Sequence, residues 1–337
     1  MNSAISGGAL GTSGTVFPAD RALRWNSTID RTLVHRNSVS EVLLTDIVPV
    51  TGTDFLVGAQ WPRSHRVYRP DSDGRHDPML LLETVRQVGL ALSHSAFGVG
   101  PEQRSMMRDL EFRLDPRVEP RALGAATDVS VGVRCEDVTM RGAALKGMTV
   151  VLFLSAAGQP FATGTGTIRW LPSDSYARFR ARSGLRDDWR DRFPEAPGPD
   201  RTHSASIAGQ PTDFRTEADS LIAAQFPVLS AVEVVAPGSR KAVRQLLVPV
   251  DHPVYFDHPL DHVPGMVLID AAWQAVLAMR PGFRARLLGC SMDCPAFTEL
   301  DAAANLEVEL SALTGTALFE VRQRGKVTAA GTLRLSR

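Results

Sequence analysis

The sequence predicts an α+β protein made of two copies of one small domain, each an antiparallel sheet wrapped around a long buried helix. The first observation is an internal repeat. Residues 64–68 align with residues 251–255 at an offset of 187 (252 − 65), and the alignment runs without a gap into two apolar stretches that begin at Met79 and Met266. Solenoid repeats have periods of about 20–50 residues. A repeat this long therefore indicates a duplicated domain.

The second observation is the pattern within each copy. The helix of the first copy begins near Pro78, a residue tolerated in a first helical turn, and fades near Gly98; the matching helix spans 265–279. Apolar residues surround the first helix on nearly every side, which is typical of a buried helix. Runs rich in Val, Thr and Leu predict strands at 110–114, 127–134, 143–155, 164–171, 245–250, 296–300, 305–312, 316–322 and 327–335. Shorter apolar runs at 33–35, 42–46 and 55–61 indicate further strands or turns.

One helix laid across an antiparallel sheet is a two-layer arrangement, and a sheet wrapped around a central helix is the hotdog fold. Two hotdogs normally pair about a two-fold axis, so a covalent tandem forms that pair internally. We expect a disordered tail at 1–24, a first hotdog at 25–172, a linker at 173–212 and a second hotdog at 213–337. The Arg-rich stretch 178–192 is interleaved with Asp and reads as a solvated linker face.

Composition excludes several function classes. Acidic and basic side chains balance to a formal net charge of zero, without the basic stripe of a nucleic-acid binder. Three scattered cysteines lack metal-ligand spacing and fit reduced thiols. No apolar run approaches the roughly 18 residues of a membrane span, and the first residues lack the features of a signal peptide. We expect a soluble cytoplasmic protein with no metal and no cofactor.

Charged and amide side chains recur inside both predicted helices. Glu83, Arg86 and Gln87 stand at i, i+3 and i+4 and share one helix face. In the second copy the acid returns as Asp270 and the amide as Gln274. A Glu83–Arg86 pair that merely neutralises itself is the structural alternative, since a buried ion costs several kcal/mol unless it is paired. The recurrence of the acid, in a helix where Asp is a mediocre former, indicates a functional position.

The copies differ in the cation, because Trp273 occupies the position of Arg86. Without a partner, the pKa of Asp270 should rise through burial, so the first site is expected to be the active one. Histidines precede each helix: His65 aligns with His252, and the second copy adds His258 and His262. A single His in a loop more often has a structural role. Several His residues beside a buried acid make a structural and a functional role equal alternatives.

Several motifs together resemble known families. The segment DHPLDHVPGM (257–266) with its downstream acid and amide resembles the loop and helix of hotdog dehydratases that act on acyl carrier protein thioesters. A resemblance over the whole chain is closer: LVHR (33–36), EVLLTD (41–46), QWPRSH (60–65) and ETVRQVG (83–89) are similar to the A-factor biosynthesis family of actinomycetes, tandem-hotdog enzymes that start γ-butyrolactone, furan or butenolide signal synthesis.

This resemblance implies an acyltransferase reaction. A β-ketoacyl group on acyl carrier protein is joined to a hydroxyl of dihydroxyacetone phosphate, and the ester closes to a butenolide phosphate. The partners implied are the acyl carrier protein and dihydroxyacetone phosphate, in a pathway of quorum sensing and secondary-metabolism regulation. The tandem supplies an internal pseudo-dimer, and a further homo-oligomer stays open.

The resemblance also implies residue roles. The family's helix acid and arginine map onto Glu83 and Arg86, with Asp270 as a shortened acid in the second copy. Glu83 is the expected general base for the hydroxyl, a role worth about 10²–10⁴-fold, and Arg86 would hold the carboxylate or the substrate phosphate. Backbone N–H groups at either helix start would polarise the thioester carbonyl. Substrate-binding roles are expected for Gln87, Gln274, His65, His258, His262 and Trp273, with His258 and His262 reaching the opposite copy's site.

Two other functions stay open on the same sequence. A hotdog dehydratase or thioesterase would act on acyl thioesters alone, but the position of the dehydratase histidine holds Arg69 in the first copy and Phe256 in the second. His258 could serve as that histidine only if the loop is shortened. A non-catalytic regulator would bind a lactone or an acyl chain. Because no helix-turn-helix segment or basic stripe is present, such a regulator would need a protein partner.

Overall fold

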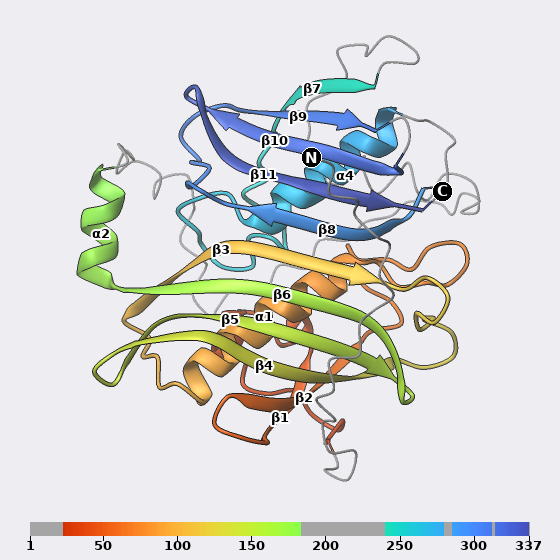
Figure 1. Cartoon of the computed structure of the whole chain (residues 1–337), viewed down its shortest axis with the longest axis vertical. Helices are drawn as coiled ribbons and strands as arrows, with labels where there is room; N and C mark the ends of the chain where they lie inside the picture. Colours follow the sequence, from red (N-terminus) through yellow and green to blue (C-terminus); the bar gives the residue numbers. More distant parts are fainter. Residues whose placement is uncertain (1–22, 183–239, 280–284, 312–313, 337) are drawn as a thin grey trace, which may run out of the picture.

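The computed structural model describes residues 23–182, 240–279, 285–311 and 314–336. The first copy contributes the strands β1 (Leu44–Pro49), β2 (Asp54–Trp61), β3 (Gln103–Leu114), β4 (Thr127–Arg141), β5 (Ala144–Ala156) and β6 (Gln159–Pro172). The second copy contributes β7 (Lys241–Gln245), β8 (Leu287–Asp293), β9 (Ala304–Leu310), β10 (Thr316–Gln323) and β11 (Lys326–Leu335). The 11 strands form one sheet in the order β1-β2-β4-β5-β6-β3-β8-β11-β10-β9-β7. Figure 1 shows this sheet from β1 at the bottom to β7 at the top.

The strand order confirms the duplication. The first copy runs β2-β4-β5-β6-β3 and the second runs β7-β9-β10-β11-β8, so each strand has a counterpart in the same place, and β1 is an addition to the first copy. All of these pairs are antiparallel. The two halves meet where β3 pairs antiparallel with β8. The chain is thus a double hotdog whose internal pair shares one sheet.

Each half carries one long helix on the same face of the sheet, behind the strands in Figure 1: α1 (Met79–Ser95) and α4 (Gly265–Met279). The bounds of α4 are those that the sequence predicts. Nearly all of α1 is buried, including its polar residues Glu83 and Gln87, which confirms a helix buried on all sides. Each fully buried aliphatic side chain contributes about 1.5–3 kcal/mol, so the packing of α1 stabilises the fold far more than its helix propensity does.

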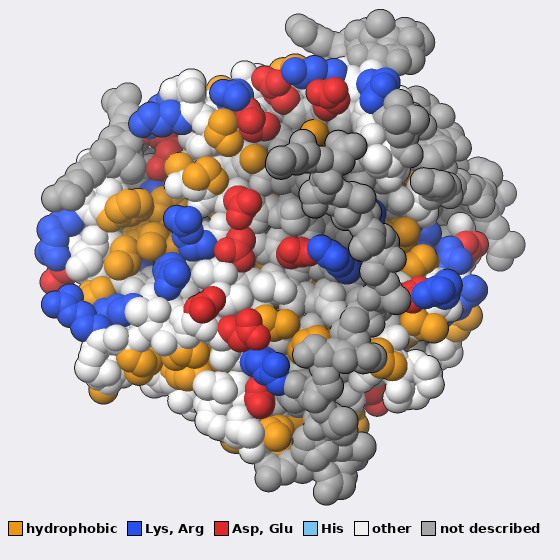
Figure 2. Space-filling view, in the orientation of Figure 1, with side chains coloured by type: hydrophobic (Ala, Val, Ile, Leu, Met, Phe, Trp, Pro, Cys, Tyr) orange, Lys and Arg blue, Asp and Glu red, His pale blue; other side chains and the backbone are white. Residues whose placement is uncertain are grey.

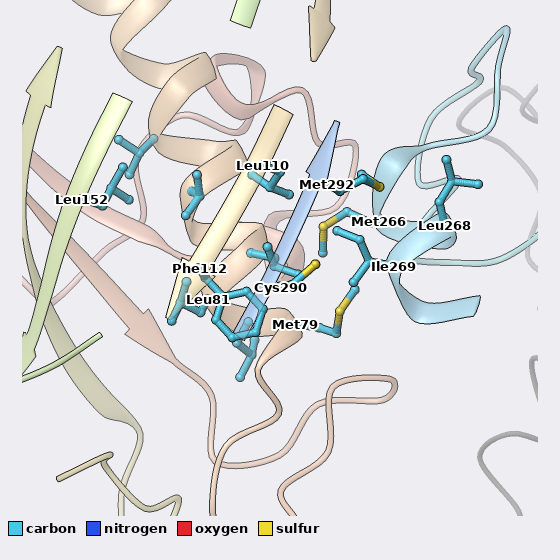
Figure 3. Packing of buried hydrophobic residues seen from close by; sticks show 14 of the residues in the cluster. Met79, Leu81, Leu110, Phe112, Leu152, Met266, Leu268, Ile269, Cys290 and Met292 are labelled. Carbon is cyan, nitrogen blue, oxygen red and sulfur yellow. The ribbon is translucent and has the colours of Figure 1, made fainter. Parts of the chain in front are cut away.

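The core is continuous across the junction between the copies. In Figure 3, Leu110 and Phe112 of β3 lie beside Cys290 and Met292 of β8 and near Ile269 of α4. The strand register places Leu110 opposite Met292 and Phe112 opposite Cys290. All five side chains belong to one buried cluster. Because that core spans both copies, α1 and the second copy's loops are held in a fixed relation.

The aligned histidines form the same turn in both copies. The Nδ1 of His65 accepts the backbone N–H groups two and three residues later, at 3.2 and 2.9 Å. The Nδ1 of His252 does the same at 3.2 and 3.1 Å. Each ring stacks on the tyrosine that follows, Tyr68 and Tyr255, and these two rings lie 6.3 Å apart. The two turns therefore meet at the interface between the copies.

Three details differ from the sequence-based prediction. The predicted strand at 296–300 is a loop with an isolated bridge between His262 and Glu299, and β8 forms before it instead. The strand predicted at 245–250 is misplaced: β7 spans Lys241–Gln245 and shares one residue with the prediction. Of the short runs near the start of the first copy, 33–35 falls mostly in a 3-10 helix, Arg31–Val34, whereas 42–46 and 55–61 contribute to β1 and β2. A second short 3-10 helix, Val39–Glu41, precedes β1.

The start of the predicted linker also departs from expectation. Residues Ser173–Arg182 form the helix α2 at the left of Figure 1, directly after β6. Arg180 is buried rather than solvated, and its guanidinium forms ion pairs with Glu299 at 2.6 Å and Asp261 at 3.2 Å. The remainder of the predicted linker, 183–212, and the tail at 1–22 lie outside the described residues.

The outer face of the sheet carries both signs of charge, interspersed among apolar side chains (Figure 2). Cys135, Cys290 and Cys294 are free thiols. In the described part of the chain, no helix is both long enough and apolar enough to cross a membrane.

Candidate active site

Glu83 lies in the middle of α1, where five hydrogen-bond donors converge on its carboxylate. Arg36, from the segment between the two 3-10 helices, binds Oε1 through Nη2 at 2.7 Å and Nε at 3.2 Å. Arg86 binds Oε1 through Nη2 at 2.7 Å and Oε2 through Nε at 2.9 Å. Gln87 donates to Oε1 at 2.6 Å. The residues that the sequence places on one helix face thus form one cluster, and Arg36 is an addition that the sequence did not indicate.

The two arginines decide the ionisation of Glu83. Burial disfavours the charged carboxylate, but the positive charges of Arg36 and Arg86 outweigh burial, and the pKa of Glu83 falls from 4.5 to about 2. The carboxylate is therefore ionised at any physiological pH. Two cations around one anion leave the cluster with a net charge of +1, which favours an anionic guest.

The cluster forms one part of a cavity of about 1130 Å³ that both copies enclose. The first copy provides residues from the segment 32–36 and from α1, β3, β5, β6 and α2, and the second provides residues from the segment 254–266. The apolar side chains in its lining include Val85, Leu90, Val99, Met107, Leu110, Val150, Ile168 and Met266. The polar side chains include Arg36, Glu83 and Arg86 together with His35, His94, His258 and His262. A guest that carries both an apolar chain and an anionic group matches this lining.

The structure places His258 and His262 in this cavity, so loop residues of the second copy face the acid of the first. The pKa of His258 falls to about 4 because the ring is buried and lies near the cations Arg86 and Arg36. Its Nδ1 is buried without a hydrogen-bond partner among the described residues. His258 is close enough to both His262 and Glu83 for its pKa to respond to each.

His262 is paired with an acid next to it in sequence. Its Nδ1 lies 2.7 Å from Oδ1 of Asp261. The same carboxylate accepts the hydroxyl of Tyr176 at 2.9 and 3.0 Å and forms an ion pair with Arg180, both from α2. Although burial opposes ionisation, these donors lower the pKa of Asp261 to about 2. Asp261, Tyr176 and Arg180 all line the cavity, and the sequence indicated none of them.

Comparison with known proteins settles the family. A model of the A-factor biosynthesis hotdog domain matches residues 19–172 and 231–336. A 2-oxo-3-(phosphooxy)propyl 3-oxoalkanoate synthase of Streptomyces virginiae is 37% identical over 256 residues, covering 76% of this chain and 78% of that protein. The chain belongs to the A-factor biosynthesis hotdog family. A synthase of the same name from Streptomyces coelicolor is 31% identical over 245 residues, covering 72% and 69%.

Solved structures with a similar chain trace are more distant from this A-factor family member. An acyl-ACP thioesterase from Bacteroides thetaiotaomicron is 13% identical, with a TM-score of 0.48, and the match covers 83% of this chain and 98% of that one. A 12:0-ACP thioesterase from Umbellularia californica is 10% identical, with a TM-score of 0.49, covering 83% and 97%. At this distance the likeness carries no inference about activity.

The second copy's acid lies in a different environment. Asp270 accepts hydrogen bonds from Gln274 at 3.1 Å and from Tyr255. No ion pair to Asp270 occurs among the residues that the structure describes, and burial raises its pKa from 3.8 to about 6. The predicted rise is confirmed. Asp270, Trp273 and Gln274 do not line the cavity around Glu83. Among the described residues of this family member, the acid that lies in the cavity with paired arginines is therefore that of the first copy.

Two predicted site residues have evident structural roles. His65 shapes the turn before α1, and its Nε2 lies 3.3 Å from Glu41; it does not line the cavity. Gln87, besides contacting Glu83, accepts the backbone N–H of Leu43 at 2.9 Å and donates to the carbonyl of Glu41 at 2.7 Å. These bonds attach α1 to the segment before β1, which positions the cluster.

Sequence reasoning missed two buried polar groups near the interface between the copies. Asp77 accepts the N–H of Met79 at the start of α1, and burial raises its pKa to about 7. The hydroxyl of Tyr68 is buried without a partner in the described residues. An Asp directly before Pro78 is a recognisable helix-start signal, whereas the repeat shows only that Tyr68 recurs as Tyr255 and does not indicate a buried hydroxyl. Among the described residues, no three His, Cys, Asp or Glu side chains are grouped to hold a metal ion.

Proposed function

We propose that the protein is an acyltransferase that joins a β-ketoacyl group, carried as a thioester on acyl carrier protein, to dihydroxyacetone phosphate. The name of the related synthases describes the corresponding product, an ester between a 3-oxoalkanoate and a phosphorylated hydroxyketone. Family membership over most of the chain supports the transfer of that activity. Because acyl carrier protein is a cytoplasmic carrier, we expect the protein to act in the cytoplasm.

The observation that carries the proposal is the net positive cluster in a cavity with an apolar wall. Arg36 and Arg86 share one carboxylate, so about one positive charge is left for a phosphate. Arg86 is the more accessible, with 23% of its side chain exposed against 5% for Arg36, and no bond to its Nη1 is found among the described residues. Arginine binds phosphate through paired donors in its planar fork.

The apolar wall suits the acyl chain. Two glycines of β6 let α1 approach the sheet closely, since a Cβ on Gly164 would lie 2.5 Å from Val85 and one on Gly166 would lie 3.1 Å from it. Gly89, one turn further along α1, lines the cavity, and a Cβ there would meet only Val150, at 3.8 Å. The space beside Gly89 is therefore open, and we propose that it holds the chain.

The geometry supports a positioning role for Glu83 rather than the role of general base. A carboxylate with a pKa of about 2 and five donors has little tendency to take a proton from an alcohol. We propose instead that it fixes the two arginines for the phosphate. The amides of Met79 and Leu80 bond to Asp77. The start of α4 at Gly265 and Met266, which lines the cavity, is thus the better candidate for polarising the thioester carbonyl.

Ring closure would follow in the same cavity. The CH₂ group between the two carbonyls of the β-ketoester loses a proton, and its carbon attacks the ketone of the dihydroxyacetone unit. Loss of water then leaves a butenolide phosphate. This intramolecular condensation needs no cofactor and no further substrate, and the product serves the synthesis of a γ-butyrolactone-type signal.

The test uses the purified full-length chain, a β-ketoacyl thioester of acyl carrier protein and dihydroxyacetone phosphate, with mass spectrometry of the products. Arg86→Met should raise KM for dihydroxyacetone phosphate by about 10–100-fold, because a hydrogen bond to a charged group is worth about 1.5–3 kcal/mol. The control Arg113→Met, at an exposed site on β3, should leave KM unchanged. With dihydroxyacetone, which lacks the phosphate, wild type and Arg86→Met should have the same KM. If Arg86→Met raises KM equally for both substrates, Arg86 does not bind the phosphate.

A further inference from the structure

The proposed reaction requires a group that accepts the proton of the attacking hydroxyl. Glu83 is fully engaged by Arg36, Arg86 and Gln87. Four histidines line the same cavity: His35, His94, His258 and His262. Their hydrogen-bond partners differ, and these partners decide which of the four is suited to act as a general base.

Three of the four lack the arrangement of a general base. His35 and His94 bond to each other through their Nε2 atoms at 2.8 Å, and His94 also bonds to the carbonyl of Val99 through Nδ1. Since His94 uses both of its nitrogens within the protein, it has none for a substrate. Neither His35 nor His258 is hydrogen-bonded to an acid among the described residues, and burial together with the charge of Arg86 disfavours the charged form of both rings.

His262 has the arrangement that the reaction needs. Its Nδ1 faces the ionised carboxylate of Asp261 at 2.7 Å, so the neutral ring carries its proton on Nδ1 and keeps a lone pair on Nε2. The ring lies 4.4 Å from that of Phe297, which restricts its orientation. Tyr176 and Arg180 hold the carboxylate, and Glu299 in turn binds Arg180 at 2.6 and 2.9 Å. An acid that orients an imidazole and stabilises its charged form is the general-base arrangement of acyl-transfer enzymes.

We propose that the Asp261–His262 pair is the general base of the acyl transfer, with Glu83 positioning the arginines that bind phosphate. This inference rests on the proposed function and assigns its proton transfer. The base comes from the second copy and the phosphate site from the first, so the tandem is needed to assemble one active site. α2, which carries Tyr176 and Arg180, then belongs to the catalytic apparatus rather than to a linker.

The step balances without any further reactant. Nε2 of His262 takes the proton of the dihydroxyacetone phosphate hydroxyl while its oxygen attacks the thioester carbonyl carbon. The tetrahedral intermediate collapses, the C–O bond remains, and the C–S bond breaks. The leaving thiolate takes the proton back from His262 and departs as the thiol of acyl carrier protein. His262 thus returns to its neutral form, and Asp261 stays ionised throughout.

His262→Gln tests the base directly. It should lower kcat for ester formation by about 10²–10⁴-fold, with little change in KM for dihydroxyacetone phosphate, and it should remove the acid limb of the pH–rate profile. Asp261→Asn should lower kcat as well, because an amide can donate to Nδ1 and hold the ring in the wrong tautomer. In His262→Ala, added imidazole should restore part of the rate, a readout that requires a folded protein and that a purely structural role would not give.

Two matched variants complete the experiment. Glu299→Gln weakens the ion pair that holds Arg180 of α2 but keeps the backbone bridge between Glu299 and His262, so the acid limb should persist in it. His258→Gln should retain the acid limb too. The inference is overturned if His262→Gln keeps the wild-type kcat, or if the acid limb is lost with His258→Gln instead. If the wild-type chain makes no ester from the two substrates, the proposed function itself fails, and that result is distinct from an active His262→Gln.

Discussion

Replacing Glu83 with Gln tests the assignment of that residue to positioning. The change keeps the shape of the side chain but removes the negative charge that Arg36 and Arg86 share. The pKa of Glu83 is lowered from 4.5 to about 2, and each pH unit corresponds to about 1.4 kcal/mol. The ion pairs therefore stabilise the native state by about 3 kcal/mol, in line with the roughly 3–5 kcal/mol lost when a buried pair is broken.

The pH dependence of that stabilisation follows from the direction of the shift. Because the native pKa is lowered, the contribution is complete above about pH 4.5 and is lost as the pH falls through about 2. Urea denaturation at pH 7 should therefore show Glu83→Gln less stable by about 3 kcal/mol, and the difference should shrink in acid. Glu111→Gln, on an exposed pair with Arg113, should stay within about 1 kcal/mol of wild type.

Kinetics separate the two roles of Glu83. As a positioning residue, it should affect KM for dihydroxyacetone phosphate, because its loss releases the arginines. A general base would give the opposite kinetic signature, with an unchanged KM and a kcat that falls by about 10²–10⁴-fold. That outcome would refute the assignment and return the proton transfer to Glu83.

Three further predictions follow from the cavity and the second copy. Gly89→Leu should fill the open space near Val150 and shift the preferred β-ketoacyl thioester to shorter chains in a mass-spectrometric competition; an unchanged chain-length profile would place the acyl chain elsewhere. Asp270 has a pKa raised from 3.8 to about 6, so its ionisation destabilises the native state as the pH rises through 6; Asp270→Asn should be more stable than wild type at pH 8, by at most about 3 kcal/mol, with no gain near pH 4. His252→Gln removes an acceptor of two backbone N–H groups and should cost about 1–3 kcal/mol in denaturant titrations; an unaltered midpoint would show that the turn does not need it.

Much of the fold could be predicted because the sequence contains the domain twice, so an element assigned in one copy can be checked against its counterpart in the other. The helix α4 was delimited correctly by its apolar run and by its alignment with α1. The strand β8 was missed because its sequence, Leu287–Asp293, includes Gly289 and Cys290 and lacks the usual β-branched residues. The following run at 296–300 resembles a strand in composition, but its backbone at Glu299 bonds to a side chain. The amide of Gln323 accepts the N–H of Glu299 and donates to its carbonyl.

The site was only partly predictable, because its key contacts join distant segments. The spacing of Glu83, Arg86 and Gln87 is local and visible in the sequence. Arg36 reaches Glu83 across 47 residues, and no periodicity encodes that contact. Arg180 lies in a stretch whose average composition is that of a solvated linker, and only the tertiary fold brings Glu299, 119 residues away, against it.

The most direct test of the account is the mass spectrum of the product formed from a defined β-ketoacyl thioester and dihydroxyacetone phosphate by the purified chain. The account predicts the phosphorylated ester, or its ring-closed form lighter by one water, only when both substrates are present. Release of free β-keto acid at the same rate without dihydroxyacetone phosphate would contradict it and indicate a thioesterase.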